Sequence, residues 1–250
     1  MRFKSLIFFT AILLGLSANA SANNLQISNV SIEDRDATLN TAIVEFDISW
    51  DNSWRNVTNY DAAWIVLKIQ YGTTWSHGIL DAAGRDPPGT SPGSDSNLEI
   101  FVPSDNRDPT VGYYGAFIYR KSSGTGTVTS RNVRLKLDYG LTGMLDTYTI
   151  KIKVVGVEMV YIPEGPFYAG DTSSTAAFQQ GAGDTDPWYI DSDATIRVNN
   201  AASNSFYYKT DGNTGEFANG TQFTIPGFFP TGYNAFYCMK YEVSEGLWLD

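Results

Sequence analysis

Alternating apolar and polar residues dominate the first part of the chain. This period of two recurs in residues 44–50, 63–71, 98–102, 111–119, 133–139 and 148–154. It places the apolar side chains on one face of a β-strand. Turn-forming residues such as Pro87, Pro88 and Gly89 separate these stretches. Several short strands divided by turns predict an antiparallel β-sandwich over residues 24–155.

The N-terminus has the three regions of a signal peptide. Two cations, Arg2 and Lys4, precede a short apolar run and then a group of small residues. This order is typical of a secretory signal, and the apolar run is too short to span a membrane. We therefore predict a cleavable signal peptide over residues 1–22, cut after Ala20 or Ala22, and an exported protein without a membrane anchor. The alternative is a core helix at the N-terminus.

The pattern changes at Gly156. Two stretches with the composition of strands, 157–165 and 235–243, enclose a long segment that is rich in Gly, Asp, Ser, Thr and Asn and shows little period. A long segment of this kind is either functional or poorly ordered. Ser244 would cap a helix, but the sequence stops within the expected first turns of that helix. We therefore expect residues 156–250 to be an incomplete domain of a longer chain.

The charge and the scarcity of two residue types exclude several classes of function. The formal net charge is -10, so the chain lacks the basic surface that nucleic-acid binding requires. His77 is the only histidine and Cys238 is the only cysteine. Neither a metal site with several histidines nor a disulfide within the chain can form. With 42% hydrophobic residues, the chain can still bury a core.

His77 and Cys238 have side chains that could take part in catalysis. A histidine base needs a nucleophile beside it, but Ser76 is its neighbour in sequence and would point to the opposite face of a strand. We expect His77 to be a surface residue or a hydrogen-bonded core residue. Cys238 lies in a strand pattern and is expected to be buried and inert. The alternative is a reactive thiol activated by Lys240 or by a helix N-terminus. We assign no catalytic residue.

Four tryptophans offer a surface that could stack on sugar rings: Trp50, Trp54, Trp64 and Trp75. Trp50 shares its strand face with Val44 and is expected to lie in the core. Trp64 alternates with the apolar positions and is the better candidate for a surface residue. The alternative is that these rings pack in the core.

Two sequence blocks in the second half of the chain carry a resemblance to a known family. The first, residues 159–171, reads MVYIPEGPFYAGD, and the second, residues 236–244, reads FYCMKYEVS. They resemble the opening strand, and the block before the first helix, of the formylglycine-generating enzyme family, also called the sulfatase-modifying-factor domain. The resemblance implies a C-type-lectin-like α+β fold, of which this chain carries the incomplete start. The predicted fold class is therefore mainly β, an antiparallel β-sandwich followed by this partial domain.

The resemblance also bears on metals. The family's enzymes hold copper with a pair of cysteines, which would have to lie beyond the end of this chain because Cys238 matches neither of them. We predict no cofactor in this chain other than a calcium ion held by Asp184, Asp186, Asp191 and Asp193. Clustered carboxylates in a loop suit calcium, and members of the family bind it, although no EF-hand spacing is present. The alternative is a solvated acidic loop.

These observations predict an exported protein with a sulfatase-modifying-factor-like domain that is not catalytic as given. The parent chain could be an oxidoreductase of the formylglycine-generating type. The alternative is an extracellular surface module that binds a glycan or a protein. A cysteine pair further along the chain would favour the enzyme, and its absence would favour binding.

Overall fold

The computed structural model describes residues 24–82, 84, 92–103, 113–170, 178–179, 187–199, 205–208 and 222–243. In this part of the chain the regular elements are fifteen β-strands, and none is a helix. The predicted mainly β fold is therefore confirmed. The predicted signal peptide and the helix expected after Ser244 lie outside the described residues.

The first layer of the fold is a three-stranded antiparallel sheet. Its central strand β2 (Thr41–Arg55) pairs with β1 (Gln26–Asp36) on one edge and with β7 (Gly124–Asp138) on the other. The pairing shifts register in four places, and at each an extra residue forms a bulge. Asparagine adopts a positive φ more readily than most residues. Three of the bulges contain Asn29 (φ 54°), Asn52 (φ 54°) and Asn132 (φ 55°). The fourth contains Asp34 (φ 40°).

The second layer is built around β3 (Tyr60–Tyr71), which follows β2 through a short hairpin. One edge of β3 pairs along most of its length with β8 (Lys151–Ile162). The other edge pairs with β6 (Ala116–Arg120) and then with β4 (Thr74–Gly78). β5 (Leu98–Phe101) extends this layer beyond β6. All of these pairings are antiparallel, as predicted.

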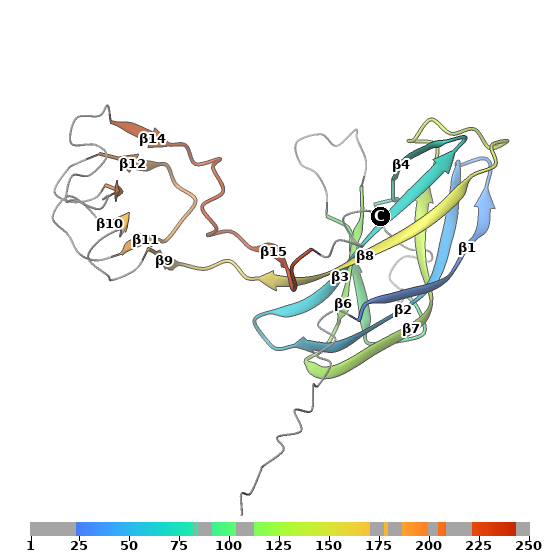
Figure 1. Ribbon diagram of the computed structural model, residues 1–250, viewed down its shortest axis with the longest axis horizontal. Coiled ribbons are helices and arrows are strands. Elements are labelled where there is room, and N and C mark those ends of the chain that lie inside the picture. Colours follow the sequence, from blue (N-terminus) through green and yellow to red (C-terminus); the bar gives the residue numbers. More distant parts are fainter. Residues whose placement is uncertain are drawn as a thin grey trace, which may run out of the picture.

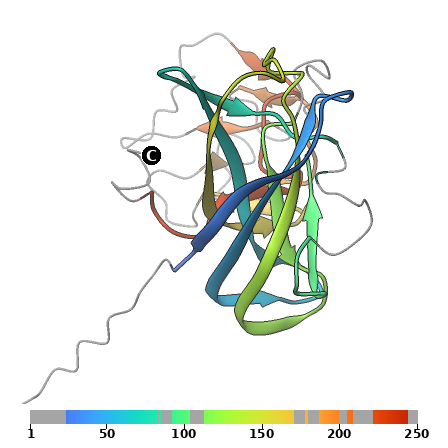
Figure 2. The same ribbon diagram turned by 90° about the vertical axis from the view of Figure 1, so that its right-hand side faces the viewer.

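One apolar core fills the space between the two layers, which curl around it (Figure 2). The predicted period of two is confirmed in β2, where Phe46 and Trp50 are buried, and in β3, where Ile65 and Leu67 are buried. Leu135 of β7 joins them from the first layer. Burying one such side chain contributes roughly 1.5–3 kcal/mol, so this core is the main source of the sandwich's stability.

β8 leads out of the sandwich into a group of short strands, which we call the C-terminal lobe (Figure 1). Its described residues form three two-stranded antiparallel sheets, in which β9 pairs with β11, β10 with β13 and β12 with β14. The chain then returns to the sandwich, where β15 (Phe236–Met239) pairs with β8. The strands of the lobe are β9 (Phe167–Ala169), β10 (Phe178–Gln179), β11 (Trp188–Ile190), β12 (Ile196–Val198), β13 (Tyr207–Tyr208) and β14 (Phe223–Ile225).

The predicted boundary between residues 155 and 156 falls inside β8. This strand pairs with β3 from Tyr161 opposite Tyr60 to Lys151 opposite Gln70, without a break at the boundary. Residues on both sides of position 155 therefore belong to one sheet. The C-type-lectin-like character of residues 156–250 stays a prediction.

The structure also bears on membrane insertion. Among the described residues, no helix has the length and apolar character needed to cross a bilayer.

We predict that Gly115→Ala destabilises the sandwich. A Cβ atom at this position, just before β6, would lie 2.7 Å from the carbonyl oxygen of Ile65 and 2.5 Å from the ring of Trp64. Backbone and a packed indole cannot give way cheaply, so we expect a loss of about 1–3 kcal/mol in the free energy of unfolding. Urea denaturation measures this loss.

Gly124→Ala is the matched control, because a Cβ atom there meets nothing within 4 Å. Its free energy of unfolding should stay within about 0.5 kcal/mol of the unchanged protein. Equal stabilities for the two alanine variants would show that β6 does not approach β3 as closely as described.

Candidate functional site

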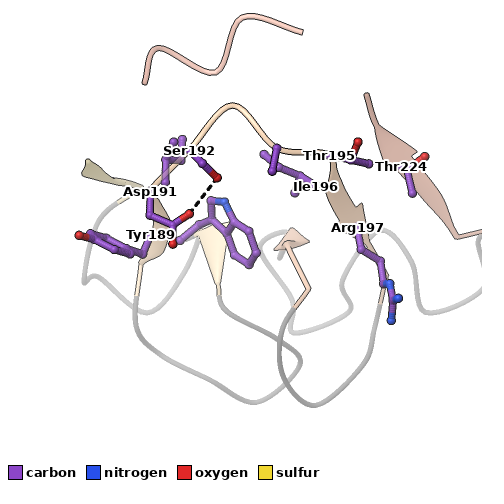
Figure 3. A pocket seen from close by; sticks show the side chains of 10 residues that line it. Tyr189, Asp191, Ser192, Thr195, Ile196, Arg197 and Thr224 are labelled. Atoms are coloured by element: carbon purple, nitrogen blue, oxygen red, sulfur yellow. Dashed lines mark hydrogen bonds between the residues drawn. The ribbon is translucent and has the colours of Figure 1, made fainter. Parts of the chain in front are cut away.

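A hollow of about 450 Å³ opens in the C-terminal lobe, between β11 and the pair of β12 and β14 (Figure 3). β11 pairs with β9, whereas β12 pairs with β14, so the two sides of the hollow belong to separate sheets. A short turn, residues 191–195, joins these two sheets. Its lining residues are Trp188, Tyr189, Ile190, Asp191, Ser192, Ala194, Thr195, Ile196, Arg197 and Thr224.

The lining of this hollow mixes aromatic rings with hydrogen-bonding groups. Tyr189 is 39% exposed, and Asp191 and Arg197 are also exposed. Figure 3 shows Asp191 and Ser192 on one side of the hollow, with Thr195 and Thr224 on the other. The hydroxyl of Ser192 donates a hydrogen bond of 3.1 Å to Asp191 Oδ1. The hollow thus offers a carboxylate, hydroxyls and a guanidinium beside apolar rings, a combination typical of sites for polar ligands.

The two described residues of the predicted calcium site take different partners. Asp191 accepts from Ser192, whereas Asp193 accepts from Thr231 and Asn234 in the segment that returns to the sandwich. Asp193 lines a second hollow, of about 470 Å³, and not the first. Within the described ranges, no three His, Cys, Asp or Glu residues lie together as a metal site. Asp184 and Asp186 lie outside those ranges, so the calcium site stays a prediction.

A second candidate site is a group of three charged side chains at one end of the sandwich, which we call the charged cluster: Asp61, Glu158 and Lys240. The side chains of Asp61 and Glu158 are 1% and 2% exposed, and that of Lys240 is 11% exposed. Lys240 Nζ lies 2.9 Å from Asp61 Oδ2 and 3.2 Å from Glu158 Oε2. The three residues come from neighbouring chain segments, because β8 pairs with β3 and the Lys240 N–H donates to the Glu158 carbonyl.

The first layer also contributes to this cluster. Trp50 Nε1 donates to Asp61 Oδ2 over 3.2 Å, and Ser53 Oγ donates to Asp61 Oδ1 over 2.9 Å. Residues three apart on a regular strand face opposite sides. The bulge at Asn52 adds one residue between Trp50 and Ser53, so both side chains reach the interior. The backbone N–H of Trp54 donates a further bond of 2.9 Å to Asp61 Oδ1.

Burial and charge shift the proton affinities in the charged cluster. Burial raises the pKa of Glu158 above its ordinary value, against the opposing effect of Lys240, and the charge on Asp61 adds to the rise. Burial alone would lower the pKa of Lys240, but Asp61 and Glu158 outweigh it, so this pKa lies above its ordinary value. Glu158 is therefore a stronger base than an ordinary carboxylate, and Lys240 is held next to it as an ammonium.

The outer face of the second layer carries an aromatic group that we call the tyrosine cluster: Tyr60, Tyr119, Tyr161 and Tyr237. The rings of Tyr60 and Tyr161 stack with centroids 4.8 Å apart, and the hydroxyls of Tyr60 and Tyr237 are 2.9 Å apart. The ring of Tyr237 also stacks on Phe117 at 3.7 Å. Burial, and then the hydrogen bond to Tyr60, raise the pKa of Tyr237 well above its usual range. These contacts hold β15 in place through the face of the sheet that is opposite the charged cluster.

The structure separates the predicted tryptophan surface. Trp50 is 1% exposed, so its prediction as a core residue is confirmed. Trp64 lies on the outer face, half-buried against Phe117, and Trp75 is 45% exposed on β4. Trp50 thus lies in the core and Trp64 on the outer surface, so the tryptophans do not form one surface.

The two chemically reactive residues are both exposed. Cys238 was expected to be buried, and this is wrong because β15 is an edge strand and Cys238 projects where no described element covers it. His77 lies at the surface of β4, one of the two placements expected for it, with its Nε2 atom 3.3 Å from Lys68 Nζ. Neither residue has an acid–base partner with the geometry of a catalytic group among the described contacts.

The charged cluster and the hollow are absent from the sequence predictions. Asp61 and Glu158 do have a signal in the sequence, because each continues the period-two positions of its strand that face the core. A charged residue at such a position has to find a buried partner. The hollow has no comparable signal, because its lining belongs to the aperiodic segment.

Comparison of the chain with protein-family models, with curated proteins and with solved structures gave no match. The resemblance to the sulfatase-modifying-factor domain therefore stays a prediction, and the two sites rest on their own geometry.

We predict that the pKa of His77 in the folded protein lies below 6.5. Partial burial and then the neighbouring ammonium of Lys68 both disfavour the charged ring. Folding thus favours the neutral ring, and its contribution to stability is lost as the pH falls from 6.5 through the lowered pKa. Because His77 is the only histidine, a proton NMR titration gives one ring signal to follow.

Removing the charge in Lys68→Met should raise the pKa of His77, whereas Lys121→Met, in the turn after β6, should leave it unchanged. A pKa at or above 6.5 in the unchanged protein, or no response to Lys68→Met, would contradict this account of the environment.

Proposed function

We propose that this chain is an exported binding protein whose C-terminal lobe holds a carbohydrate, with the β-sandwich as its platform. The observation that carries the proposal is the lining of the hollow between β11 and β12, where two aromatic residues meet a carboxylate, a guanidinium and several hydroxyls. Binding sites for small ligands typically combine apolar walls with a few well-placed polar groups.

The chemistry of a sugar ring matches this lining. A sugar has a face of C–H groups and an edge of hydroxyl groups. The rings of Trp188 and Tyr189 suit the apolar face, because aromatic side chains combine a large contact area with a polar atom at one end. Asp191 accepts hydrogen bonds from sugar hydroxyls and Arg197 donates to them. The hydroxyls of Thr195 and Thr224 serve either role.

The sulfatase-modifying-factor-like domain is also part of the proposal. Its support is the pairing of the two sequence blocks, since residues 159–162 lie opposite residues 236–239 in the β8–β15 ladder. Blocks far apart in sequence are thus neighbours in space, as parts of one domain are. A copper centre of the family type needs two thiolates, and Cys238 is the only cysteine in this chain. We therefore propose a role in binding for this chain.

A protein ligand is the second candidate. Phe228, which lines the second hollow beside Asp193, is 90% exposed, and the neighbouring Phe229 is 52% exposed. Large exposed aromatic side chains are common at surfaces that bind proteins. This face lies on the segment that returns from the lobe to β15.

We predict that the mature protein binds a soluble oligosaccharide and that the hollow provides the site. An array of soluble oligosaccharides would identify the best probe, and titration calorimetry would measure its dissociation constant. Trp188→Ala and Asp191→Asn should each weaken binding about tenfold or more, because each removes a contact worth on the order of 1.4 kcal/mol.

Phe228→Ala is the control, because Phe228 is an exposed aromatic residue after β14 that does not line this hollow. It should leave oligosaccharide binding unchanged. The proposal fails if no oligosaccharide on the array binds, or if binding survives both substitutions in the hollow. Binding lost only in Phe228→Ala would place the ligand site at the second hollow.

A further inference from the structure

The charged cluster holds an amine against a carboxyl group inside the protein. Lys240 Nζ is 2.9 Å from Asp61 Oδ2, and both side chains are almost without solvent. Lys240 reaches Asp61 across β8, where Glu158 lies between them in the sheet and within 3.2 Å of the same nitrogen. The amine, the carboxyl and a second carboxyl that can move a proton are thus in contact without intervening solvent.

The Asp61 carboxyl is held in one orientation by four donors. Its Oδ1 atom accepts from Ser53 Oγ and from the Trp54 backbone N–H, each over 2.9 Å. Its Oδ2 atom accepts from Trp50 Nε1 and from Lys240 Nζ. Two donors on Oδ1 would stabilise negative charge that develops on this oxygen during attack at the carboxyl carbon. Oδ2, on the side of the amine, is then the leaving atom.

We propose that Lys240 and Asp61 condense to an intramolecular amide bond and that Glu158 carries the proton. The nitrogen of Lys240 forms a bond to Cγ of Asp61, and the bond from Cγ to Oδ2 breaks. The ammonium loses two of its three protons, and both end on Oδ2, which leaves as water. Glu158 takes one of these protons from the nitrogen and passes it to the leaving oxygen, so it is unchanged at the end. No oxidant or cofactor takes part.

Several features of the site favour this reaction. Holding the two groups in contact removes the entropic cost of bringing them together, which is a large part of the barrier in intermolecular reactions of this kind. The product replaces a buried ion pair, which is costly to desolvate, with a neutral amide. Ser53 and Trp54 remain as donors to the amide oxygen. The raised pKa of Glu158 suits a group that has to accept a proton from an ammonium.

The bond would have a consequence for the lobe. β8 carries the chain out of the sandwich and β15 brings it back, with Lys240 directly after β15. An amide between Lys240 and Asp61 would close the chain into a covalent loop that contains the whole C-terminal lobe. Such a loop resists peeling of β15 from the sheet, and this suits a binding protein outside the cell.

Mass spectrometry of the purified, denatured protein tests the proposal. We expect the unchanged protein to be lighter than its processed sequence by one water molecule. A tryptic digest should contain a branched peptide that joins the segments around Asp61 and Lys240, with no cleavage after Lys240. Lys240→Arg keeps the charge but cannot form this amide, and Glu158→Gln cannot take the proton. Both variants should have their full masses.

Lys68→Arg is the matched control, a lysine of β3 outside the charged cluster, and it should keep the mass loss. The unchanged protein decides the question even if a variant fails to fold. A full mass and separate peptides for Asp61 and Lys240 in the unchanged protein would overturn the proposal. A bond from Lys240 to Glu158 would overturn the choice of Asp61, and water loss in Glu158→Gln would overturn the role of Glu158.

Discussion

The arrangement of this protein depends on the contact of Lys240 with the buried carboxyl groups of Asp61 and Glu158. A buried charge left without its partner costs about 3–5 kcal/mol, so the stability of the sandwich depends on β15 bringing Lys240 to these two carboxyl groups. The same contact fixes where the C-terminal part of the chain returns. On the opposite face of β15, Tyr237 stacks on Phe117 and bonds to Tyr60. β15 is thus attached on both faces, by charge on one and by aromatic packing on the other.

The lobe relies on this attachment because its own strands are short. In the described residues they contain two or three residues each and pair only in twos, and isolated two-stranded sheets are marginally stable. β8 and β15 hold the two ends of the lobe to a sandwich with a continuous apolar core. The hollow lined by Trp188, Asp191 and Arg197 therefore takes its position from the sandwich, although none of its lining residues belongs to it.

The sequence predicts the strands of the sandwich well. It does not predict the contacts that hold β15 to the sandwich, or the hollow in the lobe, and both failures have physical reasons. The period of two in β2 and β3 follows from the pleat of a strand, so the burial of Phe46 and Ile65 could be read locally. Asp61 and Glu158 occupy the same kind of position and mark a buried polar site. Their partner Lys240 lies 179 residues from Asp61, and no local period encodes such a pairing. The prediction that Cys238 is buried was wrong, because a strand pattern does not reveal that β15 is an edge strand. The hollow depends on turns between short strands, which leave no periodic pattern in the sequence.

Hydrogen exchange of the backbone amides is the most direct test of the claim that β15 is an integral strand of the sandwich sheet. We expect every second amide of residues 236–239, those that donate to β8 in the antiparallel ladder, to exchange slowly, at rates close to those of the β8 residues that they face. Fast exchange throughout residues 236–239, while β8 and β3 stay protected, would contradict it. That result would mean that the C-terminal segment is not fixed to the sandwich.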